Sequence, residues 1–247
     1  MKWRLLPFES RSAAMNMGID QAVTESVSRG GPPTIRFWRW QPSAVSIGYF
    51  QSLEDEIALE KCKELGVDVV RRITGGGAVY HDYDGEITYS VIGNQELFPK
   101  GIIDSYHLIC GWIINSLKLL GIESEFKPIN DIIVAGKKIS GNAQTRRQNV
   151  LLQHGTILYD LDVRKMFSLL KVGQEKISDK MIQSVEDRVT RILDQKQVSM
   201  EETYQSLVRG FTEGKDYEEG QLTEEELTRA KEVAESKYSQ KEWNFMR

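Results

Sequence analysis

A glycine-rich stretch at residues 71–82 constrains the fold of this 247-residue chain more than any other feature. It reads Arg-Arg-Ile-Thr-Gly-Gly-Gly-Ala-Val-Tyr-His-Asp and follows a β-branched run that predicts a short strand at 66–70. Three successive glycines have no Cβ atoms, so a ligand can approach their backbone and their N–H groups can converge on an anion. Arg72 can add a charged contact to a phosphate or carboxylate. The alternative is a glycine bulge with solvated arginines, but Arg72 and His81 on either side favour a binding site.

Composition argues against several classes of protein. The net charge of −4 disfavours a dedicated nucleic-acid binder, and no apolar run is long enough to span a bilayer. Pro7 and Glu9 interrupt the N-terminal segment too early for a secretory signal, and two cysteines cannot form a disulfide framework. We therefore expect a cytoplasmic protein. Cys62 and Cys110 fall on apolar helical stripes, which predicts buried core residues rather than nucleophiles.

The apolar pattern predicts helices and strands that alternate at first and give way to helices from about residue 162. Helices are expected at 13–28, 54–65 and 104–120, and strands at 34–40, 44–49 and 85–92. An antiparallel meander should follow at 132–134, 138–140 and 150–159, with a polar connection at 144–149. Ser199 and Thr223 each fit a capping box, and 214–220 is the expected flexible joint. The whole chain, 1–247, is expected to form one domain with a mainly helical C-terminal segment.

Three segments far apart in the sequence carry polar residues that could meet at one edge of the sheet. They are the glycine loop, the hairpin that carries Lys138 and Ser140, and the final strand with His154. Lys138 and Ser140 should share one strand face, where a lysine can neutralise a phosphate and polarise an acyl oxygen. Asn130 and Asp131 offer the oxygen ligands that Mg²⁺ prefers. The plainer alternatives are a turn residue for Asp131, a solvated lysine for Lys138 and a core histidine for His154.

Four ordered blocks of the sequence resemble the lipoate–protein ligase family, whose relatives include octanoyltransferases and biotin–protein ligases. The blocks are Arg71–Asp82, Asn130–Ile132, Gly136–Gly141 and His154–Thr156, within a likeness that runs from about residue 13 to 195. The resemblance implies a mixed α/β fold with a largely antiparallel sheet flanked by helices. It also implies an enzyme that uses ATP and Mg²⁺ to convert lipoate to lipoyl-AMP and passes the lipoyl group to a lysine of a carrier domain.

The same resemblance implies roles for individual residues. Lys138 would be the catalytic residue, in contact with the lipoyl carbonyl and the α-phosphate. The ATP and lipoyl-AMP site would also include Arg72, Thr74, Gly75, Gly76, Gly77, Ala78, Val79 and Tyr80. The lipoate pocket would be shaped by His81, Ser140, Gly141, His154 and Gly155. Mg²⁺ would lie near Asn130 and Asp131.

Two departures from the family pattern keep alternatives open. Many such ligases carry a C-terminal accessory domain, whereas this chain stops at Arg247, so a separate accessory subunit is among the expected partners. The segment 142–155 looks closer to cysteine-dependent octanoyltransferases, which move octanoyl between carriers without ATP. The corresponding segment 126–131 has no cysteine, so that covalent step lacks its nucleophile and the ligase ranks above the transferase. A third hypothesis is a silent subunit that binds lipoyl domains or the acyl adenylate.

The expected acceptors are lipoyl domains of 2-oxoacid dehydrogenase complexes or the glycine-cleavage H protein. The sequence does not choose between these carriers or between lipoate and octanoate, and it does not indicate an oligomeric state. Arg146 and Arg147 could dock an acidic carrier surface, although arginines in an exposed loop are more often simply solvated.

Overall fold

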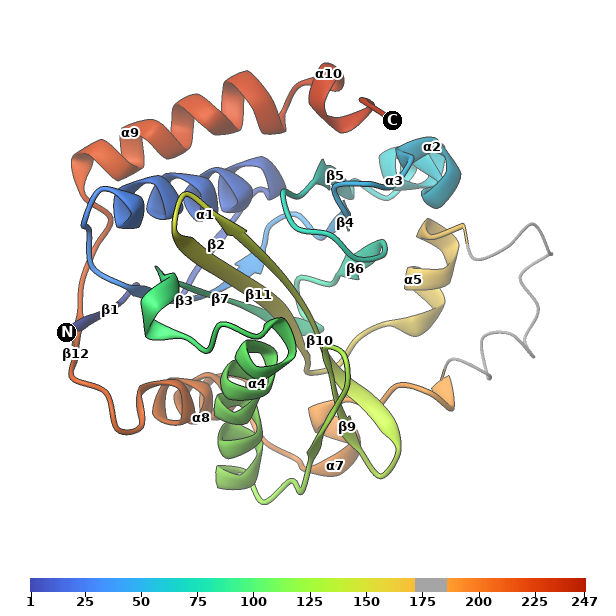
Figure 1. Cartoon of the computed structure of the whole chain (residues 1–247). Helices are drawn as coiled ribbons and strands as arrows, with labels where there is room; N and C mark the ends of the chain where they lie inside the picture. Colours follow the sequence, from blue (N-terminus) through green and yellow to red (C-terminus); the bar gives the residue numbers. More distant parts are fainter. Residues whose placement is uncertain (172–185) are drawn as a thin grey trace.

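The computed structural model describes residues 1–171 and 186–247, and its strands form two sheets (Figure 1). The larger sheet has the order β12-β1-β3-β7-β11-β10-β9-β8, with β2 also paired to β3. Its strands are β1 Trp3–Leu5, β2 Glu9–Arg11, β3 Thr34–Trp40, β7 Glu86–Asn94, β8 Glu125–Lys127, β9 Asp131–Val134, β10 Lys137–Arg147, β11 Val150–Leu158 and β12 Tyr217–Glu219. The smaller sheet, β5-β4-β6, consists of β4 Ala44–Ile47, β5 Asp68–Arg71 and β6 Val79–His81.

Pairing within the larger sheet is mainly antiparallel. The run from β3 through β7, β11, β10 and β9 to β8 is antiparallel throughout, whereas β1 and β2 join β3 in parallel. The predicted mixed α/β fold with a largely antiparallel sheet is therefore confirmed.

Helices cover both faces of the larger sheet (Figure 1). They are α1 Ala13–Ser28, α2 Leu53–Glu56, α3 Leu59–Glu64, α4 Ile102–Leu119, α5 Val163–Leu169, α7 Ile192–Gln195, α8 Met200–Thr212, α9 Glu224–Val233 and α10 Lys241–Asn244, with a 3-10 turn at Gln95–Leu97 and a π-helical turn at Ala234–Tyr238. Neighbouring strand residues point to opposite layers. Phe37 joins the core under α4 and α8, whereas Trp38 joins the core under α1 and α9. No helix in these described ranges is long and apolar enough to cross a membrane.

Several local predictions are confirmed and three are wrong. Helix α1 and strand β3 have the predicted bounds, and the capping boxes at Ser199 and Thr223 both form. The predicted helix 54–65 is two short helices, because buried Ile57 adopts an extended backbone and bridges to Leu170. The polar segment 144–149 is mostly strand, because β10 stays paired with β11 as far as Arg147. The expected joint at 214–220 contains β12, which pairs with β1. That 1–247 forms one domain stays a prediction.

Arg71 fastens the strand before the glycine loop to the C-terminal segment. Its side chain is fully buried. The guanidinium donates to main-chain oxygens of Gly48, Tyr49, Gln51, Trp243 and Asn244. The Arg71 backbone N–H also donates to Asn244 Oδ1 at 2.8 Å, and its carbonyl accepts from Trp243 Nε1 at 2.8 Å. One side chain therefore links β5, the turn after β4, and α10.

We predict that Arg71→Met lowers the free energy of unfolding by about 3 kcal/mol or more, because several buried carbonyls lose their donor. Equilibrium urea unfolding measures the change. Arg29→Met is the matched control, since Arg29 pairs with Glu225 at 2.8 Å on an exposed surface. Arg29→Met should change the free energy of unfolding by no more than about 0.5 kcal/mol. Equal losses in the two variants would contradict the fastening role of Arg71.

Candidate functional site

A cavity of about 300 Å³ lies where the two sheets meet. The smaller sheet contributes Ser46 and His81, and the larger sheet contributes Lys138 and His154. Another part of the lining is apolar and belongs to one contiguous cluster of side chains: Ala78, Tyr80, Leu158, Leu161, Met166, Leu170 and Val189. A cavity of this size is at the lower end of the roughly 300–1,000 Å³ typical of small-molecule sites.

Most of the residues predicted from the sequence line this one cavity. They are Arg72, Gly76, Gly77, Ala78, Val79, Tyr80, His81, Asn130, Lys138, Gly141, His154 and Gly155. Four predicted residues are not part of the lining: Thr74, Gly75, Asp131 and Ser140. The structure therefore brings the glycine loop, the hairpin lysine and the final strand together, while the ligand contacts assigned to them stay predictions.

The N–H groups of the Arg72 guanidinium donate to acceptors within the protein. Its Nε donates to Thr74 Oγ1 at 3.1 Å, and its Nη1 donates to the carbonyl and hydroxyl oxygens of Ser46 at 3.2 and 3.1 Å. Its Nη2 donates to the carbonyls of Gly75 and Gly77 at 2.9 and 2.7 Å. These contacts engage all the donors of a guanidinium, and burial lowers the pKa of Arg72 to about 10. The expected contact from Arg72 to a phosphate or carboxylate therefore finds no spare donor in this arrangement.

The glycine loop is shaped by these contacts and by a close neighbour. A Cβ atom on Gly48 would lie 2.0 Å from the Gly76 carbonyl oxygen, so only glycine at position 48 lets the loop approach β4. Gly76 has a φ of +97°, which side chains disfavour. Within 1–171 and 186–247, the N–H groups of Gly75, Gly76, Gly77 and Ala78 donate to no protein acceptor. Gly76, Gly77 and Ala78 line the cavity, so their N–H groups are candidate donors to a ligand.

Each of the two cavity histidines is hydrogen-bonded to a buried carboxylate. His154 Nδ1 lies 3.1 Å from Asp20 Oδ2, and His81 Nδ1 lies 2.6 Å from Glu86 Oε1. Asp20 also accepts from Arg36 Nη1 at 3.0 Å. Sequence reasoning missed these carboxylates. Their signal was an acidic residue on the apolar side of a predicted helix, Asp20, and another within an apolar strand, Glu86.

Burial and pairing together set the charges of the Asp20–His154 pair. Burial lowers the pKa of His154, and its hydrogen bond to Asp20 only partly opposes that effect. Burial alone would raise the pKa of Asp20, but the hydrogen bond with His154 and the charge of Arg36 outweigh it, so the pKa is lowered. The pair is therefore a carboxylate beside a neutral imidazole.

Lys138 lies at the hairpin side of the cavity. Its Nζ is 2.6 Å from Asp131 Oδ1, and both side chains are partly exposed. A Cβ atom on Gly141 would lie 2.7 Å from Lys138 Nζ, so the glycine makes room for the lysine. The register between β10 and β9 shifts between Lys138 and Ser140. Lys138 therefore lines the cavity while buried Ser140 does not, and the expectation of one shared face is wrong.

The hairpin is anchored beside Lys138 by Asn142. Tyr89 donates its hydroxyl to Asn142 Oδ1 at 2.6 Å, and Asn142 Nδ2 donates to the Asn130 carbonyl at 2.8 Å. A Cβ atom on Gly155 would lie 2.2 Å from Asn142 Oδ1, so position 155 has to be glycine for this packing. The final strand thus sets the position of the segment that carries Lys138.

Neither cysteine is available as a nucleophile. Cys62 packs under the smaller sheet and Cys110 lies on the buried side of α4. Burial raises the pKa of Cys62 to about 11 and that of Cys110 to about 12, so both stay protonated thiols at neutral pH. The prediction that both are core residues is confirmed.

The comparisons with known proteins extend over nearly the whole chain. A solved structure from Thermoplasma acidophilum, described as a bi-partite lipoate protein ligase with its E2 lipoyl domain, matches with a TM-score of 0.91 and 36% identity, covering 99% of this chain and 96% of that one. Octanoyltransferase LipM of Brevibacillus brevis is 36% identical over 100% of this chain and 99% of its own length. Lipoate-protein ligase A subunit 1 of Thermoplasma acidophilum is 36% identical over 99% of this chain and 97% of its own length.

These relatives correct three expectations. Further octanoyltransferases of the same name are 34–36% identical over 99–100% of this chain, so the ATP-dependent ligase was the wrong first choice and the transferase alternative is the better supported. A transferase moves an acyl group that is already activated, so ATP and Mg²⁺ as cofactors are also wrong. Asp131, one of the two residues expected near Mg²⁺, is paired with Lys138.

The family resemblance itself is confirmed. The model of the family described as Lipoyl protein ligase A/B catalytic domain matches residues 12–212, which include the glycine loop, the hairpin with Lys138 and the final strand with His154. With the cavity assembled from those same segments, this chain belongs to the Lipoyl protein ligase A/B catalytic domain family.

Proposed function

We propose that this chain is an acyltransferase that moves an octanoyl or lipoyl group from a carrier-protein thioester to a lysine amine of a lipoyl domain, without ATP. The observation that carries the proposal is the near full-length similarity to octanoyltransferases at 34–36% identity. The cavity supports it, because an apolar side-chain cluster adjoins a group of N–H donors and a lysine. That combination suits an alkyl chain that ends in a carbonyl.

A lipoyl domain is the acceptor that we propose. The bi-partite ligase of Thermoplasma acidophilum is described together with an E2 lipoyl domain, which supports an acceptor of this kind for a family member with the same fold. A related chain from that organism is named as a subunit of a ligase. Whether this chain also works with an accessory subunit, and whether its carrier is a dehydrogenase complex or the glycine-cleavage H protein, stay predictions.

The transfer proceeds in one displacement. The lysine amine of the acceptor attacks the thioester carbonyl, the new C–N bond forms as the C–S bond breaks, and the ammonium proton leaves with the carrier thiolate. Cys62 and Cys110 are buried thiols, so no acyl-enzyme thioester is formed on this chain. The loop N–H groups and Lys138 stabilise the negative charge on the carbonyl oxygen.

Lys138 can leave Asp131 to make that contact. The Lys138 and Asp131 side chains are 41% and 32% exposed, and ion pairs in such settings contribute only about 0–1 kcal/mol. Turning the ammonium from Asp131 towards an acyl oxygen therefore costs little. Asp131 holds the lysine near the cavity until a substrate arrives.

Incubation of the protein with octanoyl-carrier thioester and apo lipoyl domain should give the octanoylated lipoyl domain without ATP, detected by intact-protein mass spectrometry. The Cys62→Ser/Cys110→Ser double variant should keep this activity apart from losses of stability, because neither thiol takes part. The control replaces the thioester with free octanoate and ATP. Product formed only in that control, with release of AMP, would contradict the proposal. A folded double variant without activity would restore the thioester route.

We predict that Lys138→Met reduces kcat for this transfer by about 10²–10³-fold, the usual effect of losing one donor to a developing oxyanion. Lys137→Met is the matched control, because Lys137 is the adjacent lysine and its Nζ contacts the Glu186 carbonyl at 3.4 Å instead of the cavity. Its kcat should stay close to that of the unmodified protein. Steady-state kinetics with the thioester donor compares them, and equal losses in both variants would remove Lys138 from the transfer step.

A further inference from the structure

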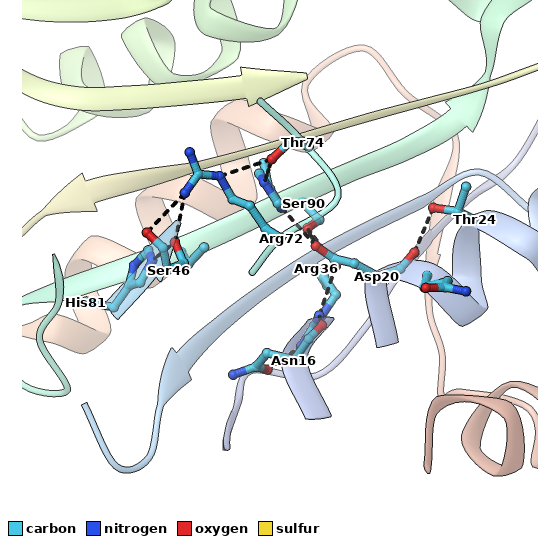
Figure 2. A network of polar contacts seen from close by, with 12 residues as sticks. Asn16, Asp20, Thr24, Arg36, Ser46, Arg72, Thr74, His81 and Ser90 are labelled. Atoms are coloured by element: carbon cyan, nitrogen blue, oxygen red, sulfur yellow. Dashed lines mark hydrogen bonds and ion pairs between the residues drawn. The ribbon is translucent and has the colours of Figure 1, made fainter. Parts of the chain in front are cut away.

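We infer that Arg72 is a positioning residue that holds both cavity histidines, His81 and His154, in the Nδ1–H tautomer with an unprotonated Nε2. Figure 2 shows Arg72 with Ser46, Thr74 and His81. The assignment follows from the direction in which each hydrogen bond has to run. An arginine N–H can only donate, and a hydroxyl group has a single proton to give. Two hydroxyl groups, on Thr74 and Ser46, connect the guanidinium to the two imidazoles.

The first connection runs through Thr74. Arg72 Nε donates to Thr74 Oγ1 at 3.1 Å, so this oxygen accepts on the Arg72 side. The same oxygen lies 2.7 Å from His154 Nε2, which is the acceptor that the described residues offer to the Thr74 hydroxyl proton. His154 Nε2 is therefore unprotonated. Its Nδ1 carries the proton and donates to Asp20 Oδ2 at 3.1 Å.

The second connection repeats this arrangement through Ser46. Arg72 Nη1 donates to Ser46 Oγ at 3.1 Å, and that oxygen lies 2.8 Å from His81 Nε2. The hydroxyl proton of Ser46 therefore points to His81 Nε2. His81 Nδ1 donates to Glu86 Oε1 at 2.6 Å. The His81 ring is also stacked on Trp40, with centroids 4.1 Å apart, which sets its plane.

In this pattern each nitrogen of the two histidines and each of the two hydroxyl groups has a partner, while Glu86 Oε2 has none among the described residues. A proton on Nε2 of either histidine would turn the acceptor of the hydroxyl proton into a second donor. The hydroxyl proton would then have no acceptor among the described residues, which is costly for a buried group. A doubly protonated imidazole would also place a second cation next to the Arg72 guanidinium.

The arrangement has a consequence for the acyl cavity, and this consequence rests on the proposed function. Both histidines have their ring nitrogens engaged by a hydroxyl group and a carboxylate, and the donors of Arg72 are used within the protein. Of the described lining residues, Lys138 is then the cation that can turn to an acyl oxygen.

The test is ¹⁵N NMR of the histidine side chains at about pH 8, above the ordinary histidine pKa of about 6.5. His81 and His154, assigned with His→Gln variants, should each show a pyridine-like Nε2 and a protonated Nδ1. His107 is the remaining histidine; it is exposed on α4 and contacts Phe126, outside this network, so its signals report any global change. Protonated Nε2 signals for His81 and His154 in the unmodified protein would overturn the inference.

Two conservative variants cut one connection each and serve as controls for one another. Thr74→Val should shift the pyridine-like Nε2 signal of His154, because that nitrogen loses its hydrogen-bond donor, and should leave the His81 signals in place. Ser46→Ala should do the reverse. Arg72→Lys keeps the charge but not the forked donors, so it should alter both histidines. If Arg72→Lys does not fold, the Thr74→Val and Ser46→Ala variants alone test the role of the two connections. Signals of both histidines that stay unchanged in all folded variants would overturn the inference.

The transfer assay separates this inference from the proposed function. The expected tautomers in a protein that transfers no acyl group would contradict the proposed function alone. Transfer by a protein whose histidines carry protonated Nε2 atoms would contradict the positioning role of Arg72 alone.

Discussion

The buried guanidinium of Arg72 is the constraint on which the site depends. Taking a cation out of water costs several kcal/mol unless its donors are all satisfied. The acceptors that satisfy it come from β4 and from the glycine loop, so the loop has to curl its carbonyls back towards Arg72. With these carbonyls engaged by Arg72, the loop N–H groups have no protein acceptor within the described residues. A side chain that looks like an anion-binding group instead shapes the backbone that can bind one.

The lining of the cavity could be predicted from the sequence to a large extent. The triple glycine, Lys138 and His154 stand out because glycines without Cβ atoms admit a ligand and a nearby cation can bind an anion, and all three regions meet in one cavity. What could not be predicted is how these groups are held. His154 and its partner Asp20 are 134 residues apart, and no local pattern records that pairing. The position of Ser140 was wrong because a register shift in β10, which alternation cannot anticipate, separates it from Lys138.

The residues of the site do not distinguish a ligase from a transferase. The segment 126–131 has no cysteine, which argues against a transferase that works through a cysteine thioester, and both cysteines of the chain are buried. Without an accessible thiol the chain cannot form an acyl-enzyme thioester, but an amine can still attack a carrier thioester directly. Both reactions need the same alkyl pocket and the same stabilisation of a carbonyl oxygen. The residues that line the cavity therefore indicate that an acyl group binds there, but they do not indicate whether it arrives as an adenylate or as a thioester.

The edge of the larger sheet has a consequence for biosynthesis. Strand β1 is paired on one side by β12, and buried Arg4 is matched by Glu226, 222 positions later. Contacts between residues so far apart in the sequence form late in folding and lower the folding rate. During translation, β1 leaves the ribosome with one edge unpaired and Arg4 without its carboxylate. The sheet is therefore completed only after residues 217–226 have been synthesised, and until then that edge is exposed to chaperones and to other chains.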